Sequence, residues 1–331
     1  MHEFKSFSER VGNLKSEEFE TLALDIFRFQ TKANPIYQKY IKARSIEVSQ
    51  IRKLDEIPFL PIRFFKDWEV VCGNADEFEG FYSSSGTTGT ITSKHYYWSE
   101  SWYLEHSRRI FESVFGSLKD FHVLALLPAY LERPGSSLVA MAKYFIENSE
   151  SDYSGFYLYN QDELLATLAK LKHGNRKVLL LGVTFALLDL AESGKKFEPM
   201  NQLLVMETGG MKGRRKEMIR EELHDTLRNF FQVPSIHSEY GMTELLSQAY
   251  SLGEGKFKLP VSMQVKLRDV NDPLSWSNRS QGGINVIDLA NFHSCSFIET
   301  QDLGKFDPDG MLEVLGRFDN SEVRGCNLLV Q

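Results

Sequence analysis

A regular alternation of strand-like and helix-like segments between residues 120 and 206 limits this chain to a few architectures. Short apolar runs of the kind that form buried strands occur at 121–127, 178–181 and 203–206. The hydrophobic periodicity predicts helices over 137–146, 162–172 and 184–192. Such alternation is typical of a layered α/β core.

The segments on either side of this core have different patterns. Phe19, Leu22, Ile26 and Phe29 recur at helical spacing within residues 17–32, and we expect the first hundred residues to be helical and peripheral. An aromatic stretch follows, and it either packs against a sheet, which we favour, or lines a substrate; its members are Phe59, Pro61, Phe64 and Trp68. The last third is expected to be mostly β, with strands near 261–267, 283–289 and 311–315.

Composition excludes several classes of protein. A net charge of -7 and an isoelectric point near 5.7 give no general attraction for nucleic acid or anionic lipid. The three cysteines lack CxxC pairing, which argues against a disulfide framework or a zinc ribbon and fits a reducing cytoplasm. Residues 1–10 do not form a secretory signal, and the longest apolar stretch, 178–188, is too short to span a bilayer. We therefore expect a cytoplasmic protein with no membrane span.

The segment YSSSGTTGT, which begins at Tyr82, has the composition of a phosphate-binding loop. Its small residues let the backbone approach a ligand, its amides and hydroxyls can donate to phosphate oxygens, and the ammonium of Lys94 can offset their charge. The Gly-Lys-Ser/Thr ending of a P-loop is missing, so a P-loop kinase or GTPase is a poor match. A polar surface turn is the alternative.

A second segment, Tyr240-Gly241-Met242-Thr243-Glu244, combines an aromatic face, a glycine and a carboxylate. The ring can stack on a purine, and the carboxylate can hold magnesium that bridges phosphates. Alone, Tyr240 could be a core residue and Glu244 a carboxylate at a helix start. The presence of both segments in one chain favours a site that binds a nucleoside triphosphate.

Two further elements, Asp302 in TQDLG and Arg317 in LGRFD, complete an ordered series. SSGTTG with a following lysine, YGMTE, an aspartate and then Gly-Arg resembles the adenylate-forming enzymes, which include acyl-CoA synthetases, luciferases and peptide-synthetase adenylation domains. The resemblance covers about residues 80 to 326. It implies the layered α/β sandwich of that family's large domain with a β-rich last third, and the use of ATP and Mg²⁺.

The resemblance also implies roles for individual residues. The β- and γ-phosphates would be held by the loop residues Ser84, Ser85, Gly86, Thr87, Thr88 and Gly89. Tyr240, followed by Gly241 and Thr243, would stack on adenine, Glu244 would bind magnesium, and Asp302 would take the ribose hydroxyls, assisted by Arg317. Gly209 and Gly210 resemble the family's element on the other face of adenine, although a plain tight turn is the alternative.

The carboxyl-terminal end directs attention to two branches of the family. Members of the family have a mobile domain with a catalytic lysine after the hinge, whereas twelve residues follow Asp319 here, so we expect that domain to be missing. We therefore divide the chain into a core domain, 1–315, and a truncated hinge and tail, 316–331. The tail resembles the Arg-Gly-x-Asn element of phenylacetate-CoA ligases and, more closely, the acyl-protein synthetases of bacterial bioluminescence.

In the acyl-protein synthetases a near-terminal cysteine accepts the acyl group as a thioester and passes it to a partner reductase. The resemblance implies that role for Cys326, beside which Arg324 could lower the thiol pKa. An inert, half-buried cysteine is the alternative. Cys72 and Cys295 are expected to be structural.

Other sites are less well supported. The chain contains neither the Gly-x-Ser-x-Gly elbow of a hydrolase nor a zinc-ligand spacing, and His237 is interpreted as a core histidine that could touch the acyl pocket. A basic cluster at 212–216 opens an expected helix, and we leave it outside the site; the apolar positions of that helix are Ile219, Leu223, Leu227 and Phe230.

Three hypotheses remain. The first is an acyl-protein synthetase that activates a carboxylic acid, in this family usually a fatty acid, for transfer to Cys326 or to a carrier or reductase. The second is an acid–CoA ligase that needs a partner domain. The third is a non-catalytic nucleotide-binding subunit.

Overall fold

The structure is a computed structural model that describes residues 2–84, 92–127, 135–158, 160–209, 218–277 and 279–318. Within these residues the helices are α1 (His2–Gly12), α2 (Phe19–Ala33), α3 (Pro35–Ala43), α4 (Phe64–Asp67), α5 (Glu100–Phe115), α6 (Ser137–Asn148), α7 (Gln161–Leu171), α8 (Thr184–Ala191) and α9 (Arg220–Phe231). The strands are β1 (Leu60–Pro61), β2 (Gly80–Ser83), β3 (Lys94–Tyr97), β4 (Phe121–Leu126), β5 (Gly155–Tyr157), β6 (Lys177–Gly182), β7 (Leu203–Glu207), β8 (His237–Tyr240), β9 (Ala249–Ser251), β10 (Lys256–Lys258), β11 (Met263–Arg268), β12 (Gln281–Asp288), β13 (Phe297–Phe306) and β14 (Leu312–Arg317).

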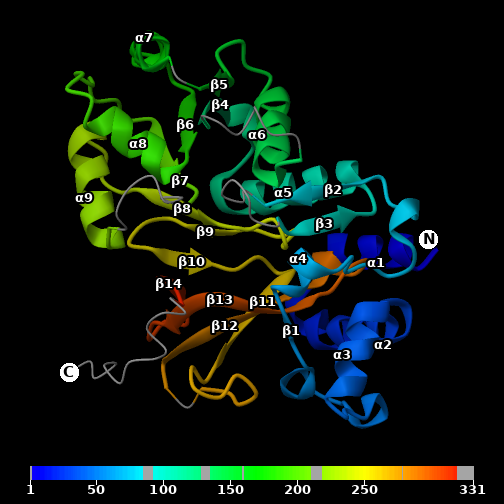
Figure 1. The fold of residues 1–331 in the computed structure, drawn as a ribbon. Helices are drawn as coiled ribbons and strands as arrows, with labels where there is room; N and C mark the ends of the chain where they lie inside the picture. Colours follow the sequence, from blue (N-terminus) through cyan, green and yellow to red (C-terminus); the bar gives the residue numbers. More distant parts are fainter. Residues whose placement is uncertain are drawn as a thin grey trace.

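Twelve strands of the described chain form one mixed sheet in the order β11-β12-β13-β14-β10-β9-β8-β7-β6-β4-β5, with β1 beside β13. Strands β4 to β8 pair in parallel, whereas the pairs from β8–β9 to β12–β11 are antiparallel. Strand β1 pairs with β13 in parallel. The parallel strands are apolar on both faces because helices cover both sides, as Figure 1 shows for α8 and α9 on one side and α5 and α6 on the other. The carboxyl ends of β7 and β8 therefore lie at one edge.

The amino-terminal helices pack on the antiparallel half of the sheet, where they lie beside β12 and β13 (Figure 1). Phe27 on α2 contacts Phe297 on β13 edge to face. Gln30 and Asn34 are buried, and their side-chain amides donate to the backbone carbonyls of Asn291 and Ser294. The expectation of helices here is confirmed. The expectation that they are peripheral is wrong, because their phenylalanines form one hydrophobic core with the antiparallel half of the sheet.

The expected alternation is confirmed from β4 to β7, and the last third contains β11, β12, β13 and β14 as expected. The helix expected from 212 begins at Arg220, so Ile219 precedes it and is exposed; the basic cluster at 212–216 lies outside the described residues. Phe59 is buried as favoured, whereas Trp68 is exposed. None of the helices in the described ranges is long and apolar enough to cross a membrane.

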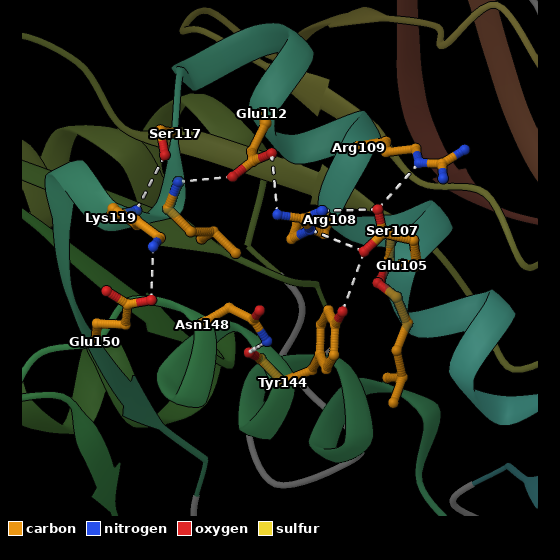
Figure 2. Close-up of polar contacts among 12 residues, drawn as sticks. Glu105, Ser107, Arg108, Arg109, Glu112, Ser117, Lys119, Tyr144, Asn148 and Glu150 are labelled. Atoms are coloured by element: carbon orange, nitrogen blue, oxygen red, sulfur yellow. Dashed lines mark hydrogen bonds and ion pairs between the residues drawn. The ribbon is translucent and has the colours of Figure 1, made fainter. Parts of the chain in front are cut away.

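A polar network joins α5 to α6 across the outside of the parallel half. In Figure 2, Arg108 and Arg109 from α5 and Tyr144 from α6 all point toward Glu105. Arg108 donates to both carboxylate oxygens at 2.7 and 2.9 Å, Arg109 donates at 3.1 Å, and the Tyr144 hydroxyl donates at 3.1 Å. The hydrogen bond from Arg108 is the largest cause that holds the pKa of Glu105 below its ordinary value, although partial burial opposes it. Glu105 therefore fixes the helix that covers β8 and β9.

We expect Glu105→Gln to lower the free energy of unfolding at pH 7 by about 1 kcal/mol. The substitution removes the negative charge of a partly exposed carboxylate that accepts hydrogen bonds from three side chains. The folded-state pKa of Glu105 is lowered, so its contribution is complete above the ordinary carboxyl pKa and is lost as the pH falls. The difference between the two proteins should shrink between about pH 5 and pH 3 in urea unfolding. Glu147 forms only an ion pair of 3.8 Å with an exposed lysine. Glu147→Gln is therefore the matched control, and its free energy of unfolding should stay close to that of the wild type. An equal loss in both variants would contradict the account.

Candidate active site

The loop with the composition of a phosphate cradle closes the hairpin of β2 and β3. Ser83 pairs with Lys94 across the two strands, and the backbone amide of Ser84 donates to the carbonyl of Ser93 at 3.1 Å. The Ser93 amide in turn donates to the Ser84 hydroxyl oxygen at 2.9 Å. Ser84 and Ser93 thus fix the base of the loop. Ser85, Gly86, Thr87, Thr88 and Gly89 lie outside the described residues.

The hairpin is joined directly to the YGMTE segment, although the two are about 150 residues apart in the sequence. His95, next to Lys94 on β3, contacts the carbonyl oxygen of Thr243 through Nδ1 at 2.9 Å. A carbonyl only accepts, so Nδ1 carries the hydrogen. Burial lowers the pKa of His95 to about 4, which keeps the ring neutral. The hairpin of β2 and β3 and the Tyr240 motif are therefore neighbours.

Tyr240, Asp302 and Arg317 form a second connection between motifs. The Tyr240 hydroxyl donates to Asp302 Oδ2 at 2.9 Å, and Arg317 Nε donates to Oδ1 at 3.2 Å. Asp302 on β13 lies opposite Arg317 on β14 in the strand register. Burial and the adjacent Asp302 carboxylate raise the pKa of Tyr240, so the hydroxyl remains a donor. All three side chains are held at one point where the two halves of the sheet meet.

Glu244 lies in the turn between these two connections. It is buried, and this burial raises the pKa of its carboxyl, although a hydrogen bond with Ser93 at the base of the phosphate loop opposes the shift. The Asn291 amide donates to the Glu244 carbonyl at 2.8 Å. Asp288 accepts from the amides of Leu246 and Ser247 at 2.9 Å each. The side chains of Asn291 and Asp288 thus fix the backbone of the turn, and the Glu244 carboxyl lies beside Ser93.

Glycine has a specific function at two positions. The backbone of Gly209, directly after β7, has a φ of +68°, and its amide donates to Glu207 Oε2 at 2.7 Å. Burial alone would raise the pKa of Glu207. Hydrogen bonds with His224, Ser238 and the Gly209 amide and the positive charge of Arg220 lower it more strongly, so the pKa of Glu207 is about 2. A Cβ on Gly241 would lie 2.9 Å from Glu239 Oε1, so a larger residue there would displace the Glu239 side chain. Gly210 lies outside the described residues.

The positions of the two remaining predicted residues carry less information. The Lys94 ammonium lies 4.9 Å from the centre of the Phe81 ring on an exposed part of the hairpin. Cys326 lies outside the described residues, whereas Cys72 and Cys295 are buried, as expected of structural cysteines. The roles assigned to Lys94 and Cys326 stay predictions.

The sequence reasoning missed the residues that hold the site together. His95, Asp288 and Asn291 belong to none of the motifs, and each makes its contact with a segment more than 40 residues away in sequence. Polar residues at 288, 291 and 293 within an otherwise apolar run are a detectable signal, because such residues are buried only when they are hydrogen-bonded. For His95, the only signal in the sequence is its position next to Lys94.

The described residues contain no group of three or more histidine, cysteine, aspartate or glutamate side chains that could hold a metal ion by themselves. Glu244 is the carboxylate that stands beside the base of the phosphate loop.

Comparison with known proteins gives a consistent result. No family model matches the chain. A long-chain-fatty-acid–luciferin-component ligase from Photorhabdus luminescens is 35% identical over 68 residues, which are 20% of this chain and 58% of that protein. The protein of the same name from Aliivibrio fischeri is 20% identical over 339 residues, which cover 93% of this chain and 86% of that protein.

Two solved structures share the fold. One is 2-hydroxyisobutyryl-CoA ligase in complex with 2-HIB-AMP and CoA, with a TM-score of 0.67 and 12% identity over 91% of this chain and 69% of that one. The other is ATP-bound MatB from Rhodopseudomonas palustris, with a TM-score of 0.53 and 17% identity; the chain spans about half of it, with 75% of this chain covered and 49% of that one. This chain therefore has the fold of the adenylate-forming ligases and is similar in sequence to the long-chain-fatty-acid–luciferin-component ligases.

Proposed function

We propose that this protein uses ATP to convert a carboxylic acid into an acyl-adenylate and then transfers the acyl group to a thiol. The observation that supports this most strongly is the convergence of the motifs. The bond from His95 to Thr243 joins the phosphate loop to the YGMTE turn, and the contacts of Tyr240 and Arg317 with Asp302 add the other two motifs. One nucleotide can therefore touch all four.

In this proposal the base of ATP lies between the Tyr240 ring and the backbone of Gly209 and Gly210. Asp302 accepts hydrogen bonds from the ribose hydroxyls, and Arg317, which is mostly exposed, reaches the same region. The loop from Ser84 to Gly89 donates to the β- and γ-phosphates. Lys94 offsets phosphate charge, a role that requires its flexible side chain to leave the Phe81 ring.

Mg²⁺ belongs beside Glu244. Its carboxylate is buried, and this burial raises its pKa. The cationic side chains among the described residues therefore do not fully compensate its charge. The ion would neutralise charge on the phosphates and on the departing pyrophosphate. Asn291 and Asp288 keep the Glu244 turn in place before the ion arrives.

The first step is a displacement at the α-phosphorus. A carboxylate oxygen of the acid forms a bond to this phosphorus, while the bond to the bridging oxygen breaks and pyrophosphate leaves with the electron pair. The acid reacts as its carboxylate, so no proton moves.

The second step is a thiol transfer. A thiolate attacks the acyl carbon, the carbon–sulfur bond forms, the bond to the AMP oxygen breaks, and AMP leaves. The thiol proton goes to solvent. We assign the thiolate to Cys326 and the acid to the fatty acids; the support is the similarity to proteins named long-chain-fatty-acid–luciferin-component ligases. A carrier protein or reductase would then receive the acyl group.

CoA is the second candidate acceptor. The similar fold of 2-hydroxyisobutyryl-CoA ligase, solved with CoA, favours it. In that case Cys326 has no covalent role, and the first step is unchanged.

The adenylation step can be tested by carboxylate-dependent exchange between ATP and labelled pyrophosphate. We expect exchange with at least one acid of a panel that covers chain lengths from two to sixteen carbons and aromatic acids. Asp302→Asn should raise the KM for ATP about tenfold, and Glu244→Gln should lower kcat about 100-fold with a higher Mg²⁺ requirement. Glu147→Gln on the surface of α6 is the matched control. The absence of exchange across the whole panel would refute the proposed function.

The link between the motifs can be tested at His95. His95→Leu removes the donor to the Thr243 carbonyl and should raise the KM for ATP about tenfold, whereas His95→Asn keeps a donor near the Nδ1 position and should stay within about threefold of wild type. Both variants should keep the wild-type circular dichroism spectrum. Equal KM values for Leu and Asn would show that this bond does not position the nucleotide.

The acceptor can be tested by the mass of the intact protein after incubation with MgATP and an active acid. We expect a thioester adduct on the wild type and on Cys72→Ala, and none on Cys326→Ser. An adduct that persists on Cys326→Ser would exclude Cys326 as the carrier. Acyl-CoA formation without any protein adduct would identify CoA as the acceptor.

A further inference from the structure

Several buried polar atoms without a hydrogen-bond partner gather on two neighbouring strands. Within the described residues they are His237 Nδ1 and Glu239 Oε2 on β8, and Gln248 Oε1 and Tyr250 Oη on or directly before β9. Buried polar groups in proteins are nearly always hydrogen-bonded, and those that are not require an explanation. We call these four residues the polar face.

The strand register places all four on one side of the sheet. Glu239 lies directly opposite Tyr250 in the antiparallel pair of β8 and β9. Side chains two residues apart point to the same side, so His237 accompanies Glu239, and Gln248 accompanies Tyr250. A Cβ on Gly241 would lie 3.5 Å from Gln248 Cγ, which confirms that Gln248 is opposite Gly241.

Helix α5 covers this side of the two strands. Phe111 and Phe115 meet the Tyr250 ring edge to face, with centroids 5.9 and 5.5 Å apart, and Phe115 also meets His237. Tyr103, two turns earlier on α5, is buried, and its pKa is raised by burial first and then by the charge of Glu239. The covering surface is thus aromatic at the His237 end and has a hydroxyl near Glu239.

The polar face begins where the candidate active site ends. Glu239 directly precedes Tyr240, and its Oε1 lies against the backbone of Gly241. Glu239 is half-buried, whereas Gln248 and Tyr250 are buried. Along the two strands from Gly241, Gln248 comes first, Glu239 and Tyr250 lie level with each other, and the phenylalanines of α5 cover Tyr250 and His237. The order is polar first and apolar afterwards.

The protonation of Glu239 fits a neutral ligand group. Burial and, to a smaller extent, the negative charge of Glu207 raise the pKa of Glu239 to about 7. A hydrogen bond from Thr208 acts in the opposite direction. Glu239 therefore exists in both forms near neutral pH and can accept or donate. A hydroxyl group matches both forms, and it also matches the amide oxygen of Gln248, because it is a donor and an acceptor.

We propose that the polar face binds the acyl part of the substrate acid and selects acids that carry a hydroxyl group close to the carboxyl group. Unpartnered polar atoms are costly to bury, and a plain alkyl chain would leave all four unpaired. A hydroxyl at the second or third carbon would pair with Glu239 or Gln248, while the rest of the chain packs on Tyr250 and α5. This rests on the proposed function, since it names the class of acid.

The test compares acids that differ only by one hydroxyl. Butanoic, 2-hydroxybutanoic and 3-hydroxybutanoic acid, and octanoic and 3-hydroxyoctanoic acid, are measured in ATP–pyrophosphate exchange. We expect kcat/KM to be at least tenfold higher for a hydroxylated acid than for its unsubstituted partner. Gln248→Leu or Tyr250→Phe should reduce this ratio at least threefold, while Tyr144→Phe, which removes a hydroxyl from the surface of α6, should leave it unchanged.

Stability separates recognition from a structural role. Tyr250→Phe removes a hydroxyl that has no partner, so its melting temperature should equal or exceed that of the wild type. Binding of the same acids without ATP, followed by saturation-transfer NMR, reads the polar face without turnover. Exchange without a preference for hydroxylated acids, or a preference that both variants retain, overturns this inference and leaves the proposed function intact. A binding preference without any exchange supports the polar face and refutes the proposed function; neither binding nor exchange contradicts both.

Discussion

The site depends on one contact between distant parts of the chain, the hydrogen bond from His95 Nδ1 to the Thr243 carbonyl. It fastens a two-stranded hairpin, which is not part of the main sheet, to the turn at the junction of the parallel and antiparallel halves. Because the histidine is buried and neutral, the bond is not screened by salt or lost at physiological pH. A hydrogen bond between Ser93 and Glu244 joins the base of the hairpin loop to the same turn.

The same junction concentrates charge that the fold must stabilise. Asp288 is buried and accepts backbone amides, Glu207 holds the turn after β7, and Asp302 is paired with Tyr240 and Arg317. Each of these carboxylates has hydrogen-bond donors, whereas one oxygen of Glu239 has no partner. An unpartnered carboxylate oxygen beside this junction is a polar atom that a ligand can use.

The sequence predicts the layered core because buried parallel strands and their helices have strong local periodicity, as in 178–181 and 184–192. It also predicts Tyr240, Asp302 and Arg317 as one site, since their motifs are recognisable, and the structure brings these side chains together. It does not predict His95, Asp288 or the face shared by Glu239 and Tyr250. Those depend on strand order and register, which are set by contacts between segments far apart in sequence. The two-residue β1, which pairs with β13, was missed for the same reason.

The central claim is that four separated motifs surround one adenylate. The most direct measurement is a crystal structure with a non-hydrolysable acyl-sulfamoyl adenosine, an analogue of the acyl-adenylate. The account predicts the adenine against the Tyr240 ring, both ribose hydroxyls on the Asp302 carboxylate, and the acyl chain along β8 and β9 beneath α5. A nucleotide bound away from Tyr240 and Asp302, or no binding at millimolar concentration, would contradict it.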